Sequence, residues 1–395
     1  MSALHILASV FGYMGALVLF IQVVFGNRLF FSFFTKDTVV VNKFHKQLGI
    51  YGTLLIFMHP LLEMMWQNSS FLWIFIPNFS IESEQYISFG RFALYLLLIV
   101  WITSAFARQK IKWRPWKYIH LLAYPLIVLT FIHALDLGQF YNDYLVVRIV
   151  WGSMFALFLV STFWRMLVWV GVGKKQTTII SKSMQGETIF LLTVSVPEGA
   201  EMSRIGQHVY LQLTRCGSEH PFTVMDVNQK KKELMFGMRT GGKFVEEIKS
   251  LDIGATLLLD GPYGTFTTEA WNESEKVIIA GGIGVTPFIR LAREYGKNSS
   301  FLYCNRTVGE ALARDTIKKE VSRYFDIVDV HEGSAEEGVI VGKLDAELLQ
   351  KILGEKITIP PYFICGSPLF ISIMKKTLLS LGIKKKNIFY EELGF

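Results

Sequence analysis

The chain has 395 residues, 51% of them hydrophobic, and its mean hydropathy is +0.36, which is too apolar for an ordinary soluble protein. The apolar residues are concentrated in the first 171 positions, and the composition after them is globular. The net charge of +7 is spread between apolar segments, so it favours a membrane topology signal over a nucleic-acid patch. Cys216, Cys304 and Cys365 form no CxxC pair, which suits a reducing cytosol.

Five apolar segments reach the length of about 20 residues that crosses a bilayer. They lie at about 4–26, 44–66, 88–106, 116–135 and 145–170. Lys and Arg follow the first, third and fifth segments, whereas the linkers 67–87 and 136–143 contain neither. The positive-inside rule therefore predicts a multi-pass plasma-membrane protein with its N-terminus outside and its C-terminal part in the cytoplasm. The first segment lacks the basic flank of a cleavable signal peptide.

Two of these segments carry four of the eight histidines, namely His45 with His59 and His120 with His133. Along a helix, 14 residues span about 21 Å and 13 residues about 19.5 Å, so the two pairs match in height. The first pair shares a face to within about 40°, but the second is about 140° out of phase unless Pro125 distorts its helix. Because imidazole is a good iron ligand, the pattern predicts two stacked hemes; packed structural histidines are the alternative.

The predicted topology sets the pairing of these histidines across the membrane. His45 would face His120 near the cytosolic side, and His59 would face His133 in the outer half. Arg91 and Arg148 begin the third and fifth segments on the outer side. They would contact heme propionates or an anionic product, or simply extend to lipid headgroups, and we favour the second interpretation.

After Lys175 the pattern changes to short alternating runs, which predict an antiparallel β-barrel. These runs are 177–183, 187–196, 207–214, 233–239 and 256–262. From about 276, predicted strands at 277–282, 300–305 and 362–367 alternate with predicted helices at 286–296, 309–324 and 368–382. That alternation indicates a parallel α/β sheet. The expected domains are 1–171 in the membrane, 172–271 as the barrel and 272–395 as the α/β domain.

Two motifs of the α/β region are typical of nucleotide sites. Gly281, Gly282 and Gly284, followed by Val285, Thr286 and Pro287, join a strand to a helix, where backbone approaches a pyrophosphate closely. This loop departs from GxGxxG because Pro287 holds the last place. Cys365, Gly366, Ser367 and Pro368 end a later strand, at the edge where open α/β sheets bind ligands. Cys365 would lie by a nicotinamide or pack in the core.

The barrel region carries three weaker motifs. His220, Pro221, Phe222 and Thr223 could hold a flavin by phosphate contact, stacking and a ring hydrogen bond, but taken alone these residues favour a plain turn. Arg239, Thr240, Gly241, Gly242 and Lys243 offer amides and a cation to a second phosphate, but Phe after the Lys excludes a Walker A loop. Gly261, Pro262, Tyr263 and Gly264 are expected to form a turn by composition.

Taken in order, HX13H, HX12H, HPFT, GPYG, GGIGVTP, CGSP and a terminal aromatic resemble the NADPH oxidase and ferric reductase transmembrane superfamily, most closely its bacterial NADPH oxidases. The C-terminal half resembles ferredoxin–NADP reductases. The fold so implied is a multi-helix transmembrane heme-binding bundle followed by a barrel FAD domain and a Rossmann-like NADPH domain. The family usually has six membrane helices, whereas five are read here, and the first is the missing one.

The resemblance implies a role for each motif. His45 and His120 would ligate the inner heme b, and His59 and His133 the outer one. FAD would bind His220 to Thr223 and Arg239 to Lys243. NADPH, with NADH as a possible substitute, would bind Gly261 to Gly264, Gly281 to Pro287, Arg306 and Cys365 to Pro368. Phe395 would stack on the flavin and, with Thr223 and Cys365, form the catalytic set.

The implied activity is electron transfer from cytosolic NADPH through FAD and two hemes to extracellular oxygen, which yields superoxide. A transmembrane ferric or cupric reductase, an electron conduit to a partner protein or quinone, and a transporter with a nucleotide-sensing tail remain alternatives. The outer loops lack a cluster that would gather a metal ion, which favours oxygen. No EF-hand loop is present, so we expect no obligatory cytosolic activator.

Overall fold

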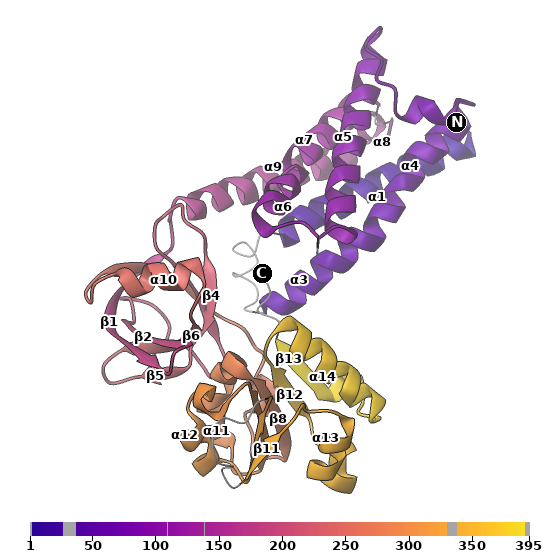
Figure 1. Cartoon of the computed structure of the whole chain (residues 1–395). Coiled ribbons are helices and arrows are strands. Elements are labelled where there is room, and N and C mark those ends of the chain that lie inside the picture. Colours follow the sequence, from indigo (N-terminus) through magenta and orange to yellow (C-terminus); the bar gives the residue numbers. More distant parts are fainter. Residues whose placement is uncertain (1, 27–36, 109, 138, 330–337, 392–395) are drawn as a thin grey trace. The chain divides into compact units, whose positions relative to one another are not determined.

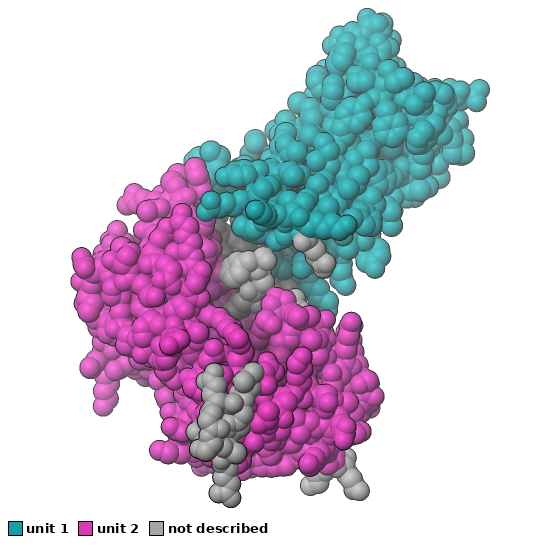
Figure 2. Space-filling model, in the orientation of Figure 1, with its two compact units in different colours: residues 1–168 teal, residues 169–395 magenta. Residues whose placement is uncertain are grey.

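The structure is a computed structural model, which describes residues 2–26, 37–108, 110–137, 139–329 and 338–391. It divides into two compact units, residues 1–168 and residues 169–395 (Figure 2). Each unit is described by itself. The sequence-based domain boundaries near 171 and 271 stay predictions.

The first unit is helical (Figure 1). Its helices are α1 (Ala3–Phe25), α3 (Thr38–Gln47), α4 (Thr53–Trp66), α5 (Glu82–Ala105), α6 (Trp113–His120), α7 (Ala123–Leu137), α8 (Gln139–Asp143) and α9 (Leu145–Trp169), with short helical turns at Leu48–Gly52 and Phe71–Ile74. Among the described residues, five stretches are long and apolar enough to span a membrane: Ala3–Phe25, Val40–Trp66, Glu82–Ala105, Trp113–Leu135 and Leu145–Trp169. The five predicted segments are thereby confirmed, and α1 packs along α4 while α5 packs along α7.

Both histidine-bearing spans depart from a regular α-helix between their histidines. The first contains a π turn at Leu48–Gly52. The second breaks after His120, where α6 ends, and resumes at Ala123 as α7. Pro125 explains the break, because its ring would clash with the carbonyl of Leu121 four residues earlier. The distortion that the phase of His120 and His133 requires is therefore present.

The barrel of the second unit has seven antiparallel strands. They are β1 (Lys175–Gln185), β2 (Ile189–Ser195), β3 (His208–Gln212), β4 (His220–Thr223), β5 (Asp226–Asn228), β6 (Glu233–Arg239) and β7 (Thr256–Tyr263), in the order β4-β3-β7-β1-β2-β6-β5. The strands at the two ends of this order follow one another in the chain, and Met225 donates its N–H to the Met235 carbonyl on β6. The sheet therefore closes on itself around one apolar core, which α10 (Lys243–Ser250) joins through Phe244, Val245 and Ile248.

The other part of the second unit is a six-stranded parallel sheet in the order β11-β10-β9-β8-β12-β13. Its strands are β8 (Lys276–Gly281), β9 (Ser299–Asn305), β10 (Arg323–Val328), β11 (Val339–Val341), β12 (Tyr362–Cys365) and β13 (Ile388–Glu391), and its helices are α11 (Ile289–Tyr295), α12 (Arg314–Glu320), α13 (Ala346–Leu353) and α14 (Pro368–Ser380). Separate apolar clusters cover the two faces. Short 3-10 turns lie at Thr268–Ala270, Gly282–Phe288, Val308–Glu310, Gly354–Thr358 and Lys385–Asn387.

Two local predictions were wrong. The predicted helix 309–324 shrinks to α12, because its last residues form β10 beside β9. The predicted turn at Gly261 to Gly264 is the end of β7, since Gly261 to Tyr263 continue the strand and Tyr263 is the register partner of His208 on β3. In both places pairing with a distant strand overrides the local composition.

The barrel and the parallel sheet are held together by charged groups. Arg293 on α11 makes a two-pronged ion pair with Asp226 on β5, with an Nη1–Oδ1 distance of 3.0 Å. The side chain of Arg290 donates to the Ser203 carbonyl at 2.9 Å. The paired carboxylate, which accepts from the guanidinium, raises the pKa of Arg293 above its ordinary value.

Candidate functional site

The four membrane histidines form two facing pairs. The ring centroids of His45 and His120 are 6.0 Å apart with their planes at 70°, and those of His59 and His133 are 6.1 Å apart at 66°. With a metal–nitrogen bond of about 2.0 Å and a ring radius of roughly 1.1 Å, two imidazoles on opposite sides of one metal ion have centroids about 6.2 Å apart. Both pairs therefore have the separation that one ion between them requires.

In all four histidines, Nδ1 contacts a group on a neighbouring helix. His59 Nδ1 lies 2.9 Å from the Ala8 carbonyl, His45 Nδ1 lies 2.9 Å from the Gln22 carbonyl, and His133 Nδ1 lies 2.8 Å from the Tyr86 carbonyl. A carbonyl accepts only, so the proton of each neutral ring is on Nδ1 and Nε2 keeps its lone pair. His120 Nδ1 lies 3.1 Å from the Ser104 hydroxyl.

This arrangement matches metal-ligating histidines, whose second nitrogen is usually held by an oxygen acceptor that fixes the tautomer and the ring. The Gln22 side-chain amide also reaches His45 Nε2 at 3.4 Å, a long contact that a metal ion at that nitrogen would replace.

Glycines leave room beside three of these rings. A Cβ on Gly12 would lie 3.1 Å from His59, one on Gly26 would lie 3.2 Å from His45, and one on Gly90 would lie 2.7 Å from His133. Any larger side chain at these places would push the imidazole away.

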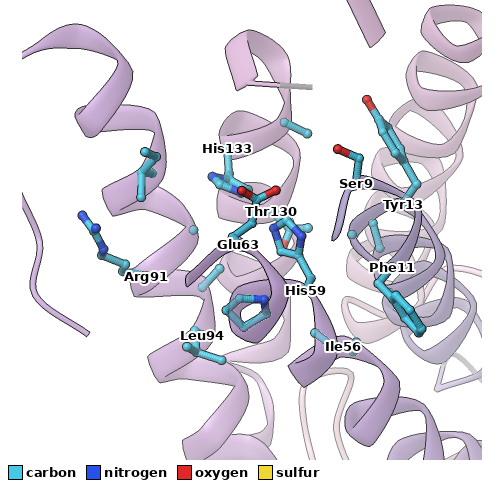
Figure 3. Close-up of a pocket in the computed structure, with 18 of the residues that line it drawn as sticks. Ser9, Phe11, Tyr13, Ile56, His59, Glu63, Arg91, Leu94, Thr130 and His133 are labelled. Atoms are coloured by element: carbon cyan, nitrogen blue, oxygen red, sulfur yellow. The ribbon is translucent and has the colours of Figure 1, made fainter. Parts of the chain in front are cut away.

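A cavity of about 350 Å³ lies around His59 and His133. Figure 3 shows His59 and His133 on facing helices, with Glu63, Arg91 and Thr130 in the same lining. Most of the remaining lining is apolar, from residues such as Phe11, Ile56 and Leu94. A mostly apolar cavity with a few polar groups at its edge is typical of a cofactor pocket.

Charged groups at this cavity are paired. Arg91 is only 4% exposed, donates to the Glu84 carboxylate at 3.1 Å and to the Trp73 carbonyl at 3.0 Å, and lies over the Trp73 ring. The interpretation that Arg91 extends to lipid headgroups was wrong, because its side chain is buried and paired with Glu84. Glu63 lies 3.3 Å from His5, whose ring packs on Trp66. Arg148 is exposed.

These observations together test the fit of heme. Each pair supplies two imidazole nitrogens at the right separation, Nδ1 contacts hold the rings, and three flanking glycines and the cavity around His59 and His133 provide space. Among the described residues, no group of three or more His, Cys, Asp and Glu side chains gathers as a site for a bare metal ion. The donor set therefore fits a metal whose remaining ligands come from a macrocycle.

In the second unit, the chain order reverses direction between β8 and β12, which are neighbours in the parallel sheet. Gly281 ends β8 and Cys365 ends β12, so the two predicted nucleotide motifs meet at this switch point. Ligands of open α/β sheets bind at such a point, outside the carboxyl ends of the strands. The structure thus brings together two motifs that are more than 80 residues apart in sequence.

The glycines of these motifs have different roles. A Cβ on Gly284 would lie 2.5 Å from the Cys365 carbonyl oxygen, and Cβ atoms on Gly281 and Gly366 would meet the Phe370 ring at 2.9 and 2.6 Å. These three glycines therefore pack the two motifs against each other. Gly282 has φ +54°, and no other group would lie within 4 Å of its Cβ, so its backbone remains open to a ligand.

The rest of the loop is buried or ordered. Val285, Thr286 and Pro287 are buried in a 3-10 turn that precedes α11. Ser367 caps α14 by accepting from the Phe370 N–H at 3.2 Å, and Pro368 takes the first helical position. Arg306, just past β9, is exposed. Phe395 lies outside the described residues.

The predicted flavin motif is a strand rather than a turn. His220, Pro221, Phe222 and Thr223 form β4, and Thr223 is buried. His220 stacks on Phe244 with centroids 4.0 Å apart, and Phe222 lies parallel to the same ring at 5.8 Å. Phe244 therefore packs against the His220 and Phe222 rings of this motif. From the sequence, this residue served only to exclude a Walker A loop.

The second predicted phosphate loop is exposed at Arg239, Gly241, Gly242 and Lys243, and Thr240 is anchored to the Thr188 carbonyl. The Gly241 N–H donates to the Glu246 carboxylate at 3.0 Å. That amide lowers the pKa of Glu246 below its ordinary value, with help from Lys249. The Glu246 carboxylate thus binds the Gly241 N–H, where the motif predicts a phosphate.

A buried acid–base pair joins the flavin and nucleotide motifs. His208 Nδ1 lies 3.6 Å from Glu391, and both side chains are almost fully buried. His208 is the register partner of Thr223 on β4, and Glu391 is the register partner of Cys365 on β12. Burial, followed by the nearby Glu391, raises the pKa of the Cys365 thiol, so this cysteine stays protonated.

Sequence reasoning missed this pair and also the Nδ1 contacts in the membrane. His208 and Glu391 are 183 positions apart, and backbone carbonyls have no sequence signature. The glycines offered a usable signal, because Gly12 and Gly26 are spaced by 14 residues, as are His45 and His59.

Part of the membrane unit matches a known family. Residues 11–131 match the family described as ferric reductase like transmembrane component. Dual oxidase 1 of Homo sapiens is 26% identical over 274 residues, which cover 61% of this chain and 17% of the relative.

Other relatives include a cytochrome b5 reductase and a flavohemoprotein. NADH-cytochrome b5 reductase 1 of Lodderomyces elongisporus is 25% identical over 223 residues, covering 52% of this chain and 74% of the relative. A flavohemoprotein of Pseudomonas putida is 24% identical over 237 residues, which cover 56% of this chain and 59% of the relative. Among solved structures, a ferredoxin reductase of carbazole 1,9a-dioxygenase covers 56% of this chain and 70% of its own at 16% identity and a TM-score of 0.48.

The chain thus joins a ferric reductase-like transmembrane component to a reductase module that binds flavin and nicotinamide nucleotides, an arrangement for electron transfer across a membrane. It is a multi-pass membrane protein whose residues 11–131 match a ferric reductase like transmembrane component, and it is homologous to the dual oxidases of Homo sapiens.

Proposed function

We propose that this protein is a superoxide-generating NADPH oxidase of the plasma membrane. When bound, FAD would split the electron pair of cytosolic NADPH, and two b-type hemes would carry the single electrons across the membrane to oxygen. The single observation that carries the proposal is the pair of histidine clamps, with centroids 6.0 and 6.1 Å apart, in a chain that continues into a reductase module.

The residues of the chain have defined tasks in this function. His45 with His120 would hold the inner heme, and His59 with His133 the outer one. Because two imidazoles on one iron leave no open coordination position, oxygen would be reduced without binding to the metal. Arg91 lines the cavity around His59 and His133 as the partner of Glu84, and from there it would contact heme propionates or an anionic product.

The orientation follows from charge. Lys and Arg gather in the linkers after the first, third and fifth spans, and Lys174 with Lys175 follows α9. The positive-inside rule then puts the reductase module in the cytoplasm and the His59–His133 pair toward the outside. Electrons would therefore leave the cell interior. Membrane lipid is the expected surrounding, and we expect no nucleic-acid partner and no obligatory cytosolic activator.

In the module, His220 to Thr223 and the loop Arg239 to Lys243 would hold FAD. The end of β7 at Gly261 to Gly264 and the motifs at the β8–β12 switch point would hold NADPH. Thr223 and Cys365, with Phe395, would frame the site of hydride transfer. The protonated Cys365 thiol suits a packing and orienting role rather than a nucleophilic one. Arg306, which is exposed just after β9, would contact the 2′-phosphate of the nucleotide, and this role would favour NADPH over NADH.

The test is NADPH oxidation by purified protein loaded with heme and FAD, with and without oxygen, together with a superoxide reporter. Oxygen-dependent turnover with a reporter signal that superoxide dismutase removes is the expected result. Turnover that requires a ferric or cupric chelate and ignores the dismutase would instead make the protein a metalloreductase. Cofactor reduction without turnover on either acceptor would indicate an electron conduit to a missing partner or quinone.

A further inference from the structure

Three of the four histidine anchors repeat one arrangement. The carbonyls of Ala8, Gln22 and Tyr86 face His59, His45 and His133, and in each case a glycine stands four residues after the acceptor. These glycines are Gly12, Gly26 and Gly90, each within 3.2 Å of its ring when a Cβ is added. The missing side chain lets the imidazole approach the helix closely enough to reach its carbonyl.

The fourth anchor differs. Ser104 stands 14 residues after Gly90, as Gly26 stands 14 residues after Gly12, so a serine takes the place of the glycine. Its hydroxyl lies 3.1 Å from His120 Nδ1. His120 is also the ligand whose ring stacks on Trp116, at 4.8 Å and 22°. The hydroxyl thus does for His120 what a carbonyl does for the other three rings.

A hydroxyl and a carbonyl are not equivalent anchors. With Nε2 on a metal ion, Nδ1 keeps its proton and the serine oxygen must accept it. A hydroxyl oxygen is a weaker acceptor than an amide carbonyl, so it draws the proton less and leaves the imidazole less basic. A less basic ligand stabilises ferric iron less, which raises the reduction potential of that heme.

We propose that Ser104 is a positioning residue that raises the potential of the inner heme through His120. The inference rests on the proposed function, in which His45 and His120 hold that heme. A raised potential of the inner heme makes electron transfer from the cytosolic module to that heme more favourable. It makes the next transfer, from the inner heme to the outer heme, less favourable. The two histidine pairs would then differ in one Nδ1 acceptor, because His120 contacts the Ser104 hydroxyl and the other three histidines contact backbone carbonyls.

The experiment compares Ser104→Ala, Ser104→Gly and Ser104→Thr in the full, heme-loaded chain. Potentiometric measurement of the heme absorbance gives two midpoints, and low-temperature electron paramagnetic resonance reports the ligand field of each ferric heme. We expect Ser104→Ala to shift one midpoint positively, because Nδ1 loses its acceptor. Ser104→Gly should shift the same midpoint negatively, because the ring gains access to the Val100 carbonyl. Ser104→Thr should keep the wild-type value.

Two further variants identify the component that moves. Thr103→Val removes the neighbouring hydroxyl, which bonds the Ile99 carbonyl at 2.7 Å, and should leave both midpoints unchanged. Gly90→Ala puts a Cβ 2.7 Å from His133 Nδ1 and should disturb the other heme.

Several results would overturn the inference while the proposed function stands. One such result is that the midpoint potentials of Ser104→Ala and Ser104→Gly equal those of the wild type. Another is that these variants shift only the midpoint of the heme that Gly90→Ala disturbs. Loss of the inner heme from Ala, Gly and Thr variants alike would reduce Ser104 to a space filler. Loss of the inner heme from Ser104→Ala, with the heme retained in Ser104→Thr, would support the role of the hydroxyl as the anchor of His120. A wild-type protein that binds no heme would instead refute the proposed function.

Discussion

The membrane unit and the reductase module are built to hold cofactors by opposite means. In the membrane unit side chains are the candidate ligands, and the backbone carbonyls of Ala8, Gln22 and Tyr86 orient them. In the module the backbone at Gly282 is open at the switch point, while the Phe370 ring packs against the neighbouring Gly281 and Gly366. The difference follows from the surroundings. In a bilayer the backbone N–H and C=O groups must bond within the protein, so side chains are left to act as ligands. In the module, free main-chain N–H groups can bind a phosphate directly.

The comparison predicts its largest effect for a membrane ligand. His59→Ala removes one of two imidazoles from the outer clamp, so the heme content should fall from two per chain to one. Acceptor reduction should stop, whereas reduction of the flavin by NADPH should survive in the separate module. Heme content is measured by the absorbance of the reduced pyridine complex, and flavin reduction by stopped-flow absorbance.

His5→Ala is the matched control for His59→Ala. His5 lines the same cavity, but it contacts Glu63 rather than a second histidine. This variant should keep both hemes. Two hemes in His59→Ala, or one in His5→Ala, would contradict the assignment of the clamps and break the comparison.

The next effect concerns the buried pair of the module. Glu391→Leu leaves His208 without its polar neighbour in the core, and a buried polar group left unpaired costs about 1–3 kcal/mol. Release of FAD on heating should therefore occur several degrees lower, as followed by flavin fluorescence. His208→Leu combined with Glu391→Leu should recover part of the loss, because it removes both polar groups.

The ion pair between half-buried Arg290 and exposed Glu294 provides the reference for these Glu391 and His208 variants. Glu294→Gln should change the stability by about 0.5 kcal/mol or less, as surface pairs do. A double variant no more stable than Glu391→Leu would show that the His208–Glu391 contact itself does not couple the barrel to the sheet.

The same two regions show what sequence can predict. The heights of His45, His59, His120 and His133 were predictable because only a few residues between the paired histidines depart from the α-helix. Their relative rotation was not, because a π turn at Leu48–Gly52 and a break before Ala123 alter the twist. The alternating strands were also predictable, since each buries one face against the barrel core.

The failures share one cause, which is dependence on distant partners. The residues after α12 became β10 because Arg323 and Tyr324 pair with Ser300 and Phe301 on β9. The His208–Glu391 contact joins two strands from different sheets. Neither pairing can be read from a local window, whereas GGIGVTP and CGSP were recognised because each motif is continuous in the chain.

A smaller effect tests whether module glycines act by packing. Gly284→Ala puts a Cβ 2.5 Å from the Cys365 carbonyl oxygen, and backbone there must shift at a cost of about 1–3 kcal/mol. NADPH should bind more weakly and flavin reduction should slow, as measured by stopped-flow kinetics. Gly309→Ala, whose Cβ would meet nothing closer than 4.0 Å, should behave as wild type. Equal effects in both variants would contradict the packing role.

The smallest effect concerns an anion that competes with the cofactor. Glu246 accepts from the Gly241 N–H that the motif reserves for a phosphate, and this bond lowers the pKa of its carboxyl group. Glu246→Gln should therefore strengthen FAD binding severalfold, because a neutral amide competes for the N–H less well than a carboxylate. A carboxyl with a lowered pKa stays charged through neutral pH, so the difference should persist there and shrink as the pH falls through that lowered pKa. Titration of the apoprotein with FAD, followed by quenching of flavin fluorescence, measures it. Weaker binding in Glu246→Gln would mean that the carboxylate orders the loop for FAD, and backbone N–H groups would then not be the main holders of phosphate in this module.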